Sequence, residues 1–83
     1  MSDWKPIDTA PKDGRTILAR AFVGAGSHDV FIRWDEARAT WVHADGGTEY
    51  TAYDPALWIP APAGLEKDVA AFKAWFRRDW PQQ

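Results

Sequence analysis

Six tryptophans are spread along this chain of 83 residues, so that nearly every segment able to form a structural element carries one. A domain of this size is short of buried surface, and large aromatic side chains supply much of it per residue. The chain has no cysteine, so neither a disulfide nor a thiolate metal site can stabilise it. We therefore expect a single domain, residues 1–83, held together by an aromatic-rich core, by self-association, or by both.

The first segment, residues 1–14, is predicted to be an extended arm that ends in a tight turn. Pro6 and Pro11 disfavour a helix and favour an extended path. The run Pro11-Lys12-Asp13-Gly14 is typical of a turn, because proline presets the backbone angle and glycine accepts positive φ.

Residues 15–60 are predicted to form a β-meander of three to four short strands. In residues 15–23 both alternating sets of side chains are largely apolar, which favours a central strand. Residues 29–35 and 40–43 alternate like strands and are predicted to form an antiparallel hairpin. Residues 57–59 form the last short strand, stopped by the prolines that follow.

A C-terminal helix is predicted over residues 65–79. Leu65, Val69, Phe72 and Phe76 recur at spacings of four, three and four, which makes one apolar helical stripe. The predicted fold class is therefore α+β: a small antiparallel β-sheet of three to four strands with one C-terminal helix packed on a face.

The helix stripe and one face of the sheet are expected to make the core together, whereas Leu18 and Phe22 point to the opposite face. Trp4 and Ile7 of the arm are candidates to cover that second face. The expected core consists of Ile17, Ala19, Ala21, Val30, Ile32, Trp34, Val42, Trp58, Val69, Phe72 and Phe76.

Residues 4–14, which read Trp-Lys-Pro-Ile-Asp-Thr-Ala-Pro-Lys-Asp-Gly, carry a family resemblance. They resemble the opening of a group of small proteins from bacteria, phages and prophages with a Trp-x-Pro-Ile-x-Thr-Ala-Pro-Lys-Asp-Gly motif. Arg33-Trp34-Asp35, Trp41 and the Trp-Ile-Pro-Ala-Pro run at 58–62 are shorter matches, so the resemblance covers residues 4–62. It implies a compact domain in bacterial or phage cytoplasm and supplies no catalytic residues.

An enzyme would have to draw on His28, His43, Asp45, Glu49 and Asp54, which are the candidate acid–base groups. The two histidines are separated by fifteen residues and show no recognised metal-ligand spacing. The glycine runs lack a phosphate-binding pattern. We therefore predict no catalytic residues, no metal and no cofactor, and keep an enzyme centred on His43 and the 45–54 loop as the third interpretation.

Cations and tryptophans gather near the end of the predicted helix. Trp and Arg are enriched at interface hot spots, and the same residues can stack on bases and hold phosphates. The formal net charge of −2 gives no overall electrostatic signal for nucleic acid. The candidate interaction surface consists of Lys73, Trp75, Arg77, Arg78 and Trp80.

The sequence therefore favours a non-catalytic protein-interaction module that binds an unknown protein partner or associates as a homodimer. Tyr50 and Tyr53 offer a second patch, and open sheet edges offer a route through strand addition. The alternative is a small nucleic-acid-associated protein that uses the C-terminal helix. No apolar stretch is long enough for a membrane span, so we expect a cytoplasmic protein, and the resemblance implies a phage or prophage association.

Overall fold

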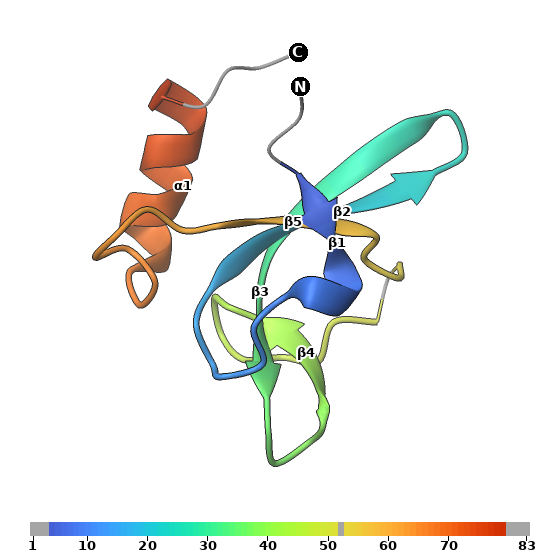
Figure 1. The fold of residues 1–83 in the computed structure, drawn as a ribbon, viewed down its shortest axis with the longest axis horizontal. Helices are drawn as coiled ribbons and strands as arrows, with labels where there is room; N and C mark the ends of the chain where they lie inside the picture. Colours follow the sequence, from blue (N-terminus) through green and yellow to red (C-terminus); the bar gives the residue numbers. More distant parts are fainter. Residues whose placement is uncertain (1–3, 52, 80–83) are drawn as a thin grey trace.

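A computed structural model describes residues 4–51 and 53–79 (Figure 1). Its elements, in chain order, are β1 (Lys5–Pro6), the short 3-10 helix η1 (Ile7–Thr9), β2 (Ile17–Val23), β3 (Gly26–Asp35), β4 (Thr40–His43), β5 (Leu57–Pro60) and α1 (Val69–Asp79). The strands of this part of the chain form one antiparallel sheet in the order β1-β5-β2-β3-β4. The predicted α+β class, a small antiparallel sheet with one C-terminal helix, is confirmed.

The chain follows the predicted meander only from β2 to β4. After β4 it crosses the sheet, and β5 pairs with the far side of β2, where Leu18 lies opposite Ile59. β1 then pairs with the outer edge of β5. This return makes β2 a central strand, which explains why both of its faces are apolar.

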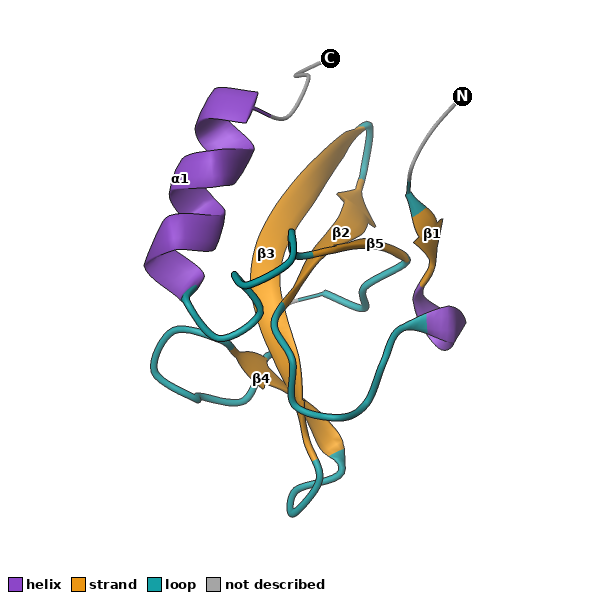
Figure 2. Ribbon diagram, turned by 60° about the vertical axis from the view of Figure 1, so that its left-hand side comes forward, coloured by secondary structure: helices purple, strands orange, loops and turns teal. Residues whose placement is uncertain are grey.

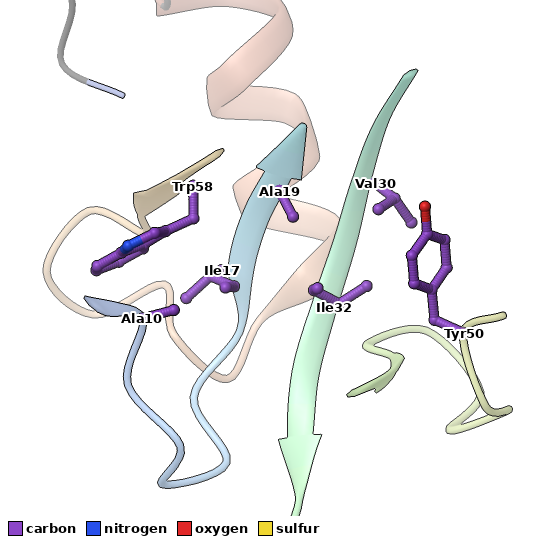
Figure 3. Packing of buried hydrophobic residues seen from close by; sticks show 7 residues of the cluster. All are labelled: Ala10, Ile17, Ala19, Val30, Ile32, Tyr50 and Trp58. Carbon is purple, nitrogen blue, oxygen red and sulfur yellow. The ribbon is translucent and has the colours of Figure 1, made fainter. Parts of the chain in front are cut away.

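One face of the sheet is covered by the N-terminal arm and by the segment that crosses from β4 to β5. Figure 3 shows Ile17, Ala19, Val30 and Ile32 on the strands, with Ala10 and Tyr50 packed beside them; Trp58 completes this cluster. Ile7 and Trp41 pack against its margin. The prediction that the helix covers this face is wrong, because the arm and the crossing segment already occupy it.

The helix α1 covers the opposite face, around Leu18. Figure 2 shows α1 on one side of the sheet and the β1–η1 arm on the other. Phe72 is fully buried against Leu18 and Ile59, and its ring meets that of Phe31 edge to face at 5.0 Å. Trp4 packs against this second cluster, as predicted, whereas Ile7 packs on the other face.

The helix begins four residues later than its apolar stripe predicts. The Asp68 carboxylate accepts a hydrogen bond from the Ala71 amide at 3.0 Å, and this N-cap sets the start of α1 at Val69. Leu65 lies before the helix but still packs against the second cluster. The Glu66 carbonyl accepts a hydrogen bond from the Thr16 amide at 3.0 Å, which ties this connection to the start of β2.

Most of the predicted core is buried, with three exceptions. Trp34, Val69 and Phe76 are only half-buried. The Trp34 ring lies edge-on to Trp41 at 5.2 Å, at the margin of the sheet rather than in its centre. The sequence did not predict that Ala10, Tyr50 and Ile59 are buried; Leu18, whose need for cover was predicted, is buried as well.

Candidate functional site

The predicted surface on α1 is distributed around the helix. Lys73 reaches Asp45 at 3.5 Å and lies 5.7 Å from the centre of the Phe31 ring, so it bridges α1 to the loop after β4. Trp75 is half-buried against the second core cluster, with its ring 6.0 Å from that of Phe72. Residues two apart on a helix point about 200° from each other, so Lys73 and Trp75 lie on opposite flanks.

Two further members of that set, Arg77 and Arg78, lie on the solvent side of α1. Arg77 and Arg78 are exposed, and Arg78 contacts its neighbour Asp79 at 3.3 Å. Trp80 lies outside the described residues. The described members therefore form no single cationic and aromatic patch of the kind that single-stranded nucleic acid needs.

Three tryptophans outside α1 each have a cation over the ring: Trp34 and Trp58 lie in the sheet, and Trp4 precedes β1. A cation in this position is attracted by the ring quadrupole and occupies the face on which a base would stack. These contacts give the tryptophans a structural role. The pairs are Arg20 with Trp4 at 4.2 Å, Lys12 with Trp34 at 4.4 Å and Lys5 with Trp58 at 5.8 Å, measured to the ring centres.

Each candidate histidine packs against a tyrosine ring. His43 packs edge-on to the Tyr50 ring at 5.4 Å, and His28 packs edge-on to Tyr53 at 5.9 Å. Asp45 contacts Lys73 rather than a histidine. Within residues 4–51 and 53–79, no group of three or more histidine or acidic side chains is arranged to hold a metal ion.

The exposed large apolar side chains gather at one end of the molecule. Among the described residues these are Phe22 (59% exposed), Tyr53 (46%) and Val23 (36%). Phe22 and Val23 end β2, just before the two-residue turn of Gly24 and Ala25, where Gly24 has a φ of +58°. We call residues 21–29 the distal hairpin; Figure 1 shows it projecting away from α1 and β4.

The two outer strands of the sheet are protected in different ways. β1 lies along β5, and a strand of two residues that includes Pro6 offers little to a further strand. Beyond β4, the His43 amide donates to the Thr48 carbonyl at 2.7 Å, and the Tyr50 amide donates to the Trp41 carbonyl at 3.0 Å. Residues 48–50 therefore cover the β4 edge.

The edge of the distal hairpin on β3 is open. The Ala44 amide donates to the Phe31 carbonyl at 2.9 Å, so Phe31 directs its backbone groups away from β2. By the alternation of an antiparallel ladder, Asp29 and Ser27 point theirs the same way. Nothing in the described part of the chain bonds to those amides and carbonyls. The outward backbone groups of Phe22 on β2 have no partner among residues 4–51 and 53–79 either, since β5 reaches only Arg20.

An ion pair marks the boundary between the covered and the open part of the hairpin. The Arg20 guanidinium donates to both carboxylate oxygens of Asp29, at 2.8 and 3.0 Å, across the β2–β3 pair. Trp4 lies over the same guanidinium. Hydrogen bonding to Asp29 raises the pKa of Arg20, with burial opposing it. Beyond this pair Phe22 is 59% exposed.

On the other face, Tyr50 and Tyr53 differ in exposure. Tyr50 is buried, and its hydroxyl has no hydrogen-bond partner among the described residues. Burial raises the pKa of this hydroxyl; the nearby backbone amide of Tyr53 opposes that shift without completing a hydrogen bond. Of the predicted tyrosine patch only Tyr53 is exposed, beside His28 on the distal hairpin.

Sequence reasoning identified Phe22 as a residue that needs cover but did not identify the distal hairpin as a surface. The signal was present in Gly24-Ala25-Gly26-Ser27, which follows Phe22 and Val23 directly. Four small residues in a row give the apolar pair no large neighbour across the hairpin. In the structure Phe22 lies opposite Ser27 across the hairpin, as this run of small residues indicates.

Comparison with known proteins gave no match: no family model, no curated protein and no solved structure resembles this chain significantly. In the part of the chain that the structure describes, α1 and η1 are too short or too polar to cross a membrane.

Proposed function

We propose that the protein is a non-catalytic protein-interaction module that contacts its partner through the distal hairpin. The observation that supports this proposal is that the distal hairpin has both unpaired backbone groups at its edges and exposed apolar side chains. Proteins ordinarily cover or blunt their sheet edges, and this sheet does so at β1 and beyond β4.

The chemistry of the distal hairpin suits an extended partner segment. Unpaired amides and carbonyls on a strand edge accept another strand, and side-chain contacts beside the edge provide specificity. Phe22 offers an apolar anchor, with the stacked Trp4 and Arg20 next to it on the same face. Aromatic and arginine side chains of this kind dominate binding energy at interfaces.

The cellular setting belongs to the same proposal. A chain without cysteine is suited to a reducing cytoplasm. The resemblance of residues 4–62 to small bacterial and phage proteins supports a phage or prophage association. In that setting the module would bind a host or phage protein.

Site-specific photo-crosslinking in the native host tests the proposal. A photoreactive phenylalanine analogue replaces Phe22, and the matched control carries it at Ala74, which is exposed on α1. We expect a discrete adduct from position 22 that is absent from position 74. Equal adducts from both positions, or none from position 22, would contradict the proposal.

The captured protein must then be purified and its affinity measured. Phe22→Ser should weaken binding at least about tenfold, the usual loss at a hot spot, whereas Arg77→Ser on α1 should leave it unchanged. The opposite pattern, together with binding to short single-stranded DNA that weakens steeply with salt, would favour the nucleic-acid alternative.

A further inference from the structure

The structure assigns Asp45-Gly46, in the loop after β4, as a site of spontaneous backbone modification, at which the aspartate isomerises to isoaspartate. The chain contains two Asp-Gly dipeptides, Asp13-Gly14 and Asp45-Gly46. Aspartate followed by glycine favours this reaction, because glycine has no Cβ to hinder attack by its own amide. The two dipeptides have the same reacting groups, so their surroundings decide which of them reacts.

The reaction needs only water. The Gly46 amide nitrogen attacks the side-chain carboxyl carbon of Asp45 and forms a new C–N bond, and the amide hydrogen leaves with the carboxyl hydroxyl as water. The cyclic succinimide then takes up one water molecule at either of its two carbonyls. Opening at the main-chain carbonyl directs the backbone through the side-chain carbon and gives isoaspartate, whereas opening at the other carbonyl restores aspartate.

The attacking amide is available in both dipeptides. Gly14 and Gly46 have similar backbone conformations, with φ of +90° and +99°. Neither amide donates a hydrogen bond to another group within residues 4–51 and 53–79. The difference between the two dipeptides therefore lies in the aspartate side chains.

Arg15 holds the Asp13 carboxylate in place. Its Nε donates to both carboxylate oxygens, at 3.1 and 3.0 Å, and its Nη2 lies 2.8 Å from one of them. The Arg15 amide also donates to this carboxylate, at 3.3 Å. The hydrogen bonds from the side chain and then from the amide lower the pKa of Asp13, so less of it is in the protonated form that loses water. They also restrain its rotation towards the Gly14 amide.

Asp45 is held much more weakly. Its side chain is 79% exposed, and Lys73 is the only donor to it in the described part of the chain. That contact measures 3.5 Å, at the outer limit of a hydrogen bond, and an exposed pair of this kind contributes little. The carboxyl group is therefore free to rotate towards the Gly46 amide.

The product changes the loop that holds residues 48–50 on the β4 edge. Isoaspartate adds one carbon atom to the backbone between His43 and Thr48. Two hydrogen bonds close this loop: the His43 amide donates to the Thr48 carbonyl at 2.7 Å, and the Gly47 amide donates to the His43 carbonyl at 3.0 Å. The longer backbone should disturb both, so ageing of the protein should open a second sheet edge to other chains.

Peptide mapping of the aged protein tests the assignment. The folded wild-type chain is kept in mildly acidic heavy-oxygen water. Each isomerised peptide should carry one added heavy oxygen atom and resist a protease that cleaves before aspartate. We expect isomerisation at position 45 to be at least about threefold faster than at position 13, the factor that an exposed ion pair supplies. In urea, where Arg15 no longer holds Asp13, the two positions should react at similar rates.

Arg15→Met is the matched variant for the protected dipeptide. It removes the guanidinium contacts at the surface and should raise the rate at Asp13 in the folded chain towards that at Asp45. Amide spectra confirm that the variant is folded. Equal rates at the two positions of the folded wild type, a difference that persists in urea, or an Asp13 rate that does not respond to Arg15→Met would each overturn the inference.

Hydrogen exchange tests the structural consequence. In the isomerised wild type the His43 and Tyr50 amides, which bond to the Thr48 and Trp41 carbonyls, should exchange faster than before ageing. Asp45→Glu keeps the charge but would have to form a larger ring, so the aged variant should show no isomerisation and no change at these amides. Unchanged exchange in the isomerised wild type would contradict the opening of the β4 edge.

Discussion

The two halves of the β2–β3 hairpin are made from the same pair of strands in one continuous register, yet they have opposite surroundings. The proximal half, residues 17–20 and 30–35, has α1 on one face, the arm and Tyr50 on the other, and strands at both edges. In the distal half, residues 21–29, Ala21 is still buried, but the strands then extend past this cover and Phe22 is exposed. The difference shows that cover from other elements, rather than strand composition, separates core from surface here.

The Arg20–Asp29 pair is the physical boundary between the halves. Each side chain is roughly one-quarter exposed (28% and 27%), because cover from Trp4 ends there. Substitutions at side chains packed on the proximal half should therefore lower the free energy of unfolding strongly. Substitutions at exposed side chains of the distal half should change it little.

The largest effect is expected for Phe72→Ala. This ring is fully buried between α1 and the proximal half. Removing it leaves a cavity, so the free energy of unfolding should fall by about 3–5 kcal/mol in urea denaturation. A loss below about 1 kcal/mol, typical of a surface change, would mean that α1 does not pack on this face.

Arg20→Met should cost less, because the boundary pair is only partly buried. It keeps the apolar stem and leaves Asp29 without its partner, and we expect a loss of about 2 kcal/mol, between the values for exposed and buried pairs. Arg15→Met is the matched control, since Arg15 pairs with Asp13 at the surface, and its denaturation midpoint should stay unchanged. Equal effects of the two substitutions would contradict the boundary.

The helix cap gives the next effect. Asp68→Ala removes the acceptor for the Ala71 amide and should lower the free energy of unfolding by about 1 kcal/mol. Asp68→Asn, which retains a capping oxygen, should recover most of it. If both variants lose the same stability, then charge rather than the hydrogen bond matters at this helix end.

Tyr50→Phe should be neutral or stabilise the protein by up to about 1 kcal/mol, because it removes a buried hydroxyl with no hydrogen-bond partner. Burial raises the Tyr50 pKa in the folded state above its ordinary value of 10.0. Below pH 10 the hydroxyl is neutral in both the folded and the unfolded state. As the pH rises from 10 through the folded pKa, ionisation favours the unfolded state, so the free energy of unfolding of the wild type falls. Denaturation curves above pH 10 should show the wild type losing stability faster than Tyr50→Phe; parallel curves would show that the hydroxyl does not resist ionisation.

The smallest change is expected for Phe22→Ala. This side chain is 59% exposed, so the free energy of unfolding should stay within about 0.5 kcal/mol of the wild type. Its comparison with Phe72→Ala uses the same chemical change in the two environments. A loss above 2 kcal/mol at Phe22 would show that the distal half is packed in solution.

Much of the fold follows from local pattern. The alternation in residues 17–23 and 40–43 and the stripe of Phe72 and Phe76 predict the observed strands and helix because each is fixed by residues close in sequence. The face that α1 covers could not be predicted. Both faces of β2 are apolar, so the choice depends on where the distant arm and the 48–56 segment pack.

The candidate site was less predictable than the fold. Lys73 and Trp75 are neighbours in sequence, but the helix directs them to opposite flanks, and Asp45 engages the lysine from a distant loop. Phe22 is exposed because the described parts of the arm and α1 do not bury it, and which strand end a distant element covers is not fixed by local pattern. Burial of Tyr50 likewise depends on the path of the crossing segment.

Amide hydrogen exchange at residues 27 and 29 tests the central claim most directly, because their protection reports whether the β3 edge is bonded. In a dilute sample we predict fast exchange at Ser27 and Asp29 and slow exchange at Ala19 and Val30, which pair within the sheet. Slow exchange at Ser27 and Asp29 in the dilute sample would contradict an open edge and the function proposed for it.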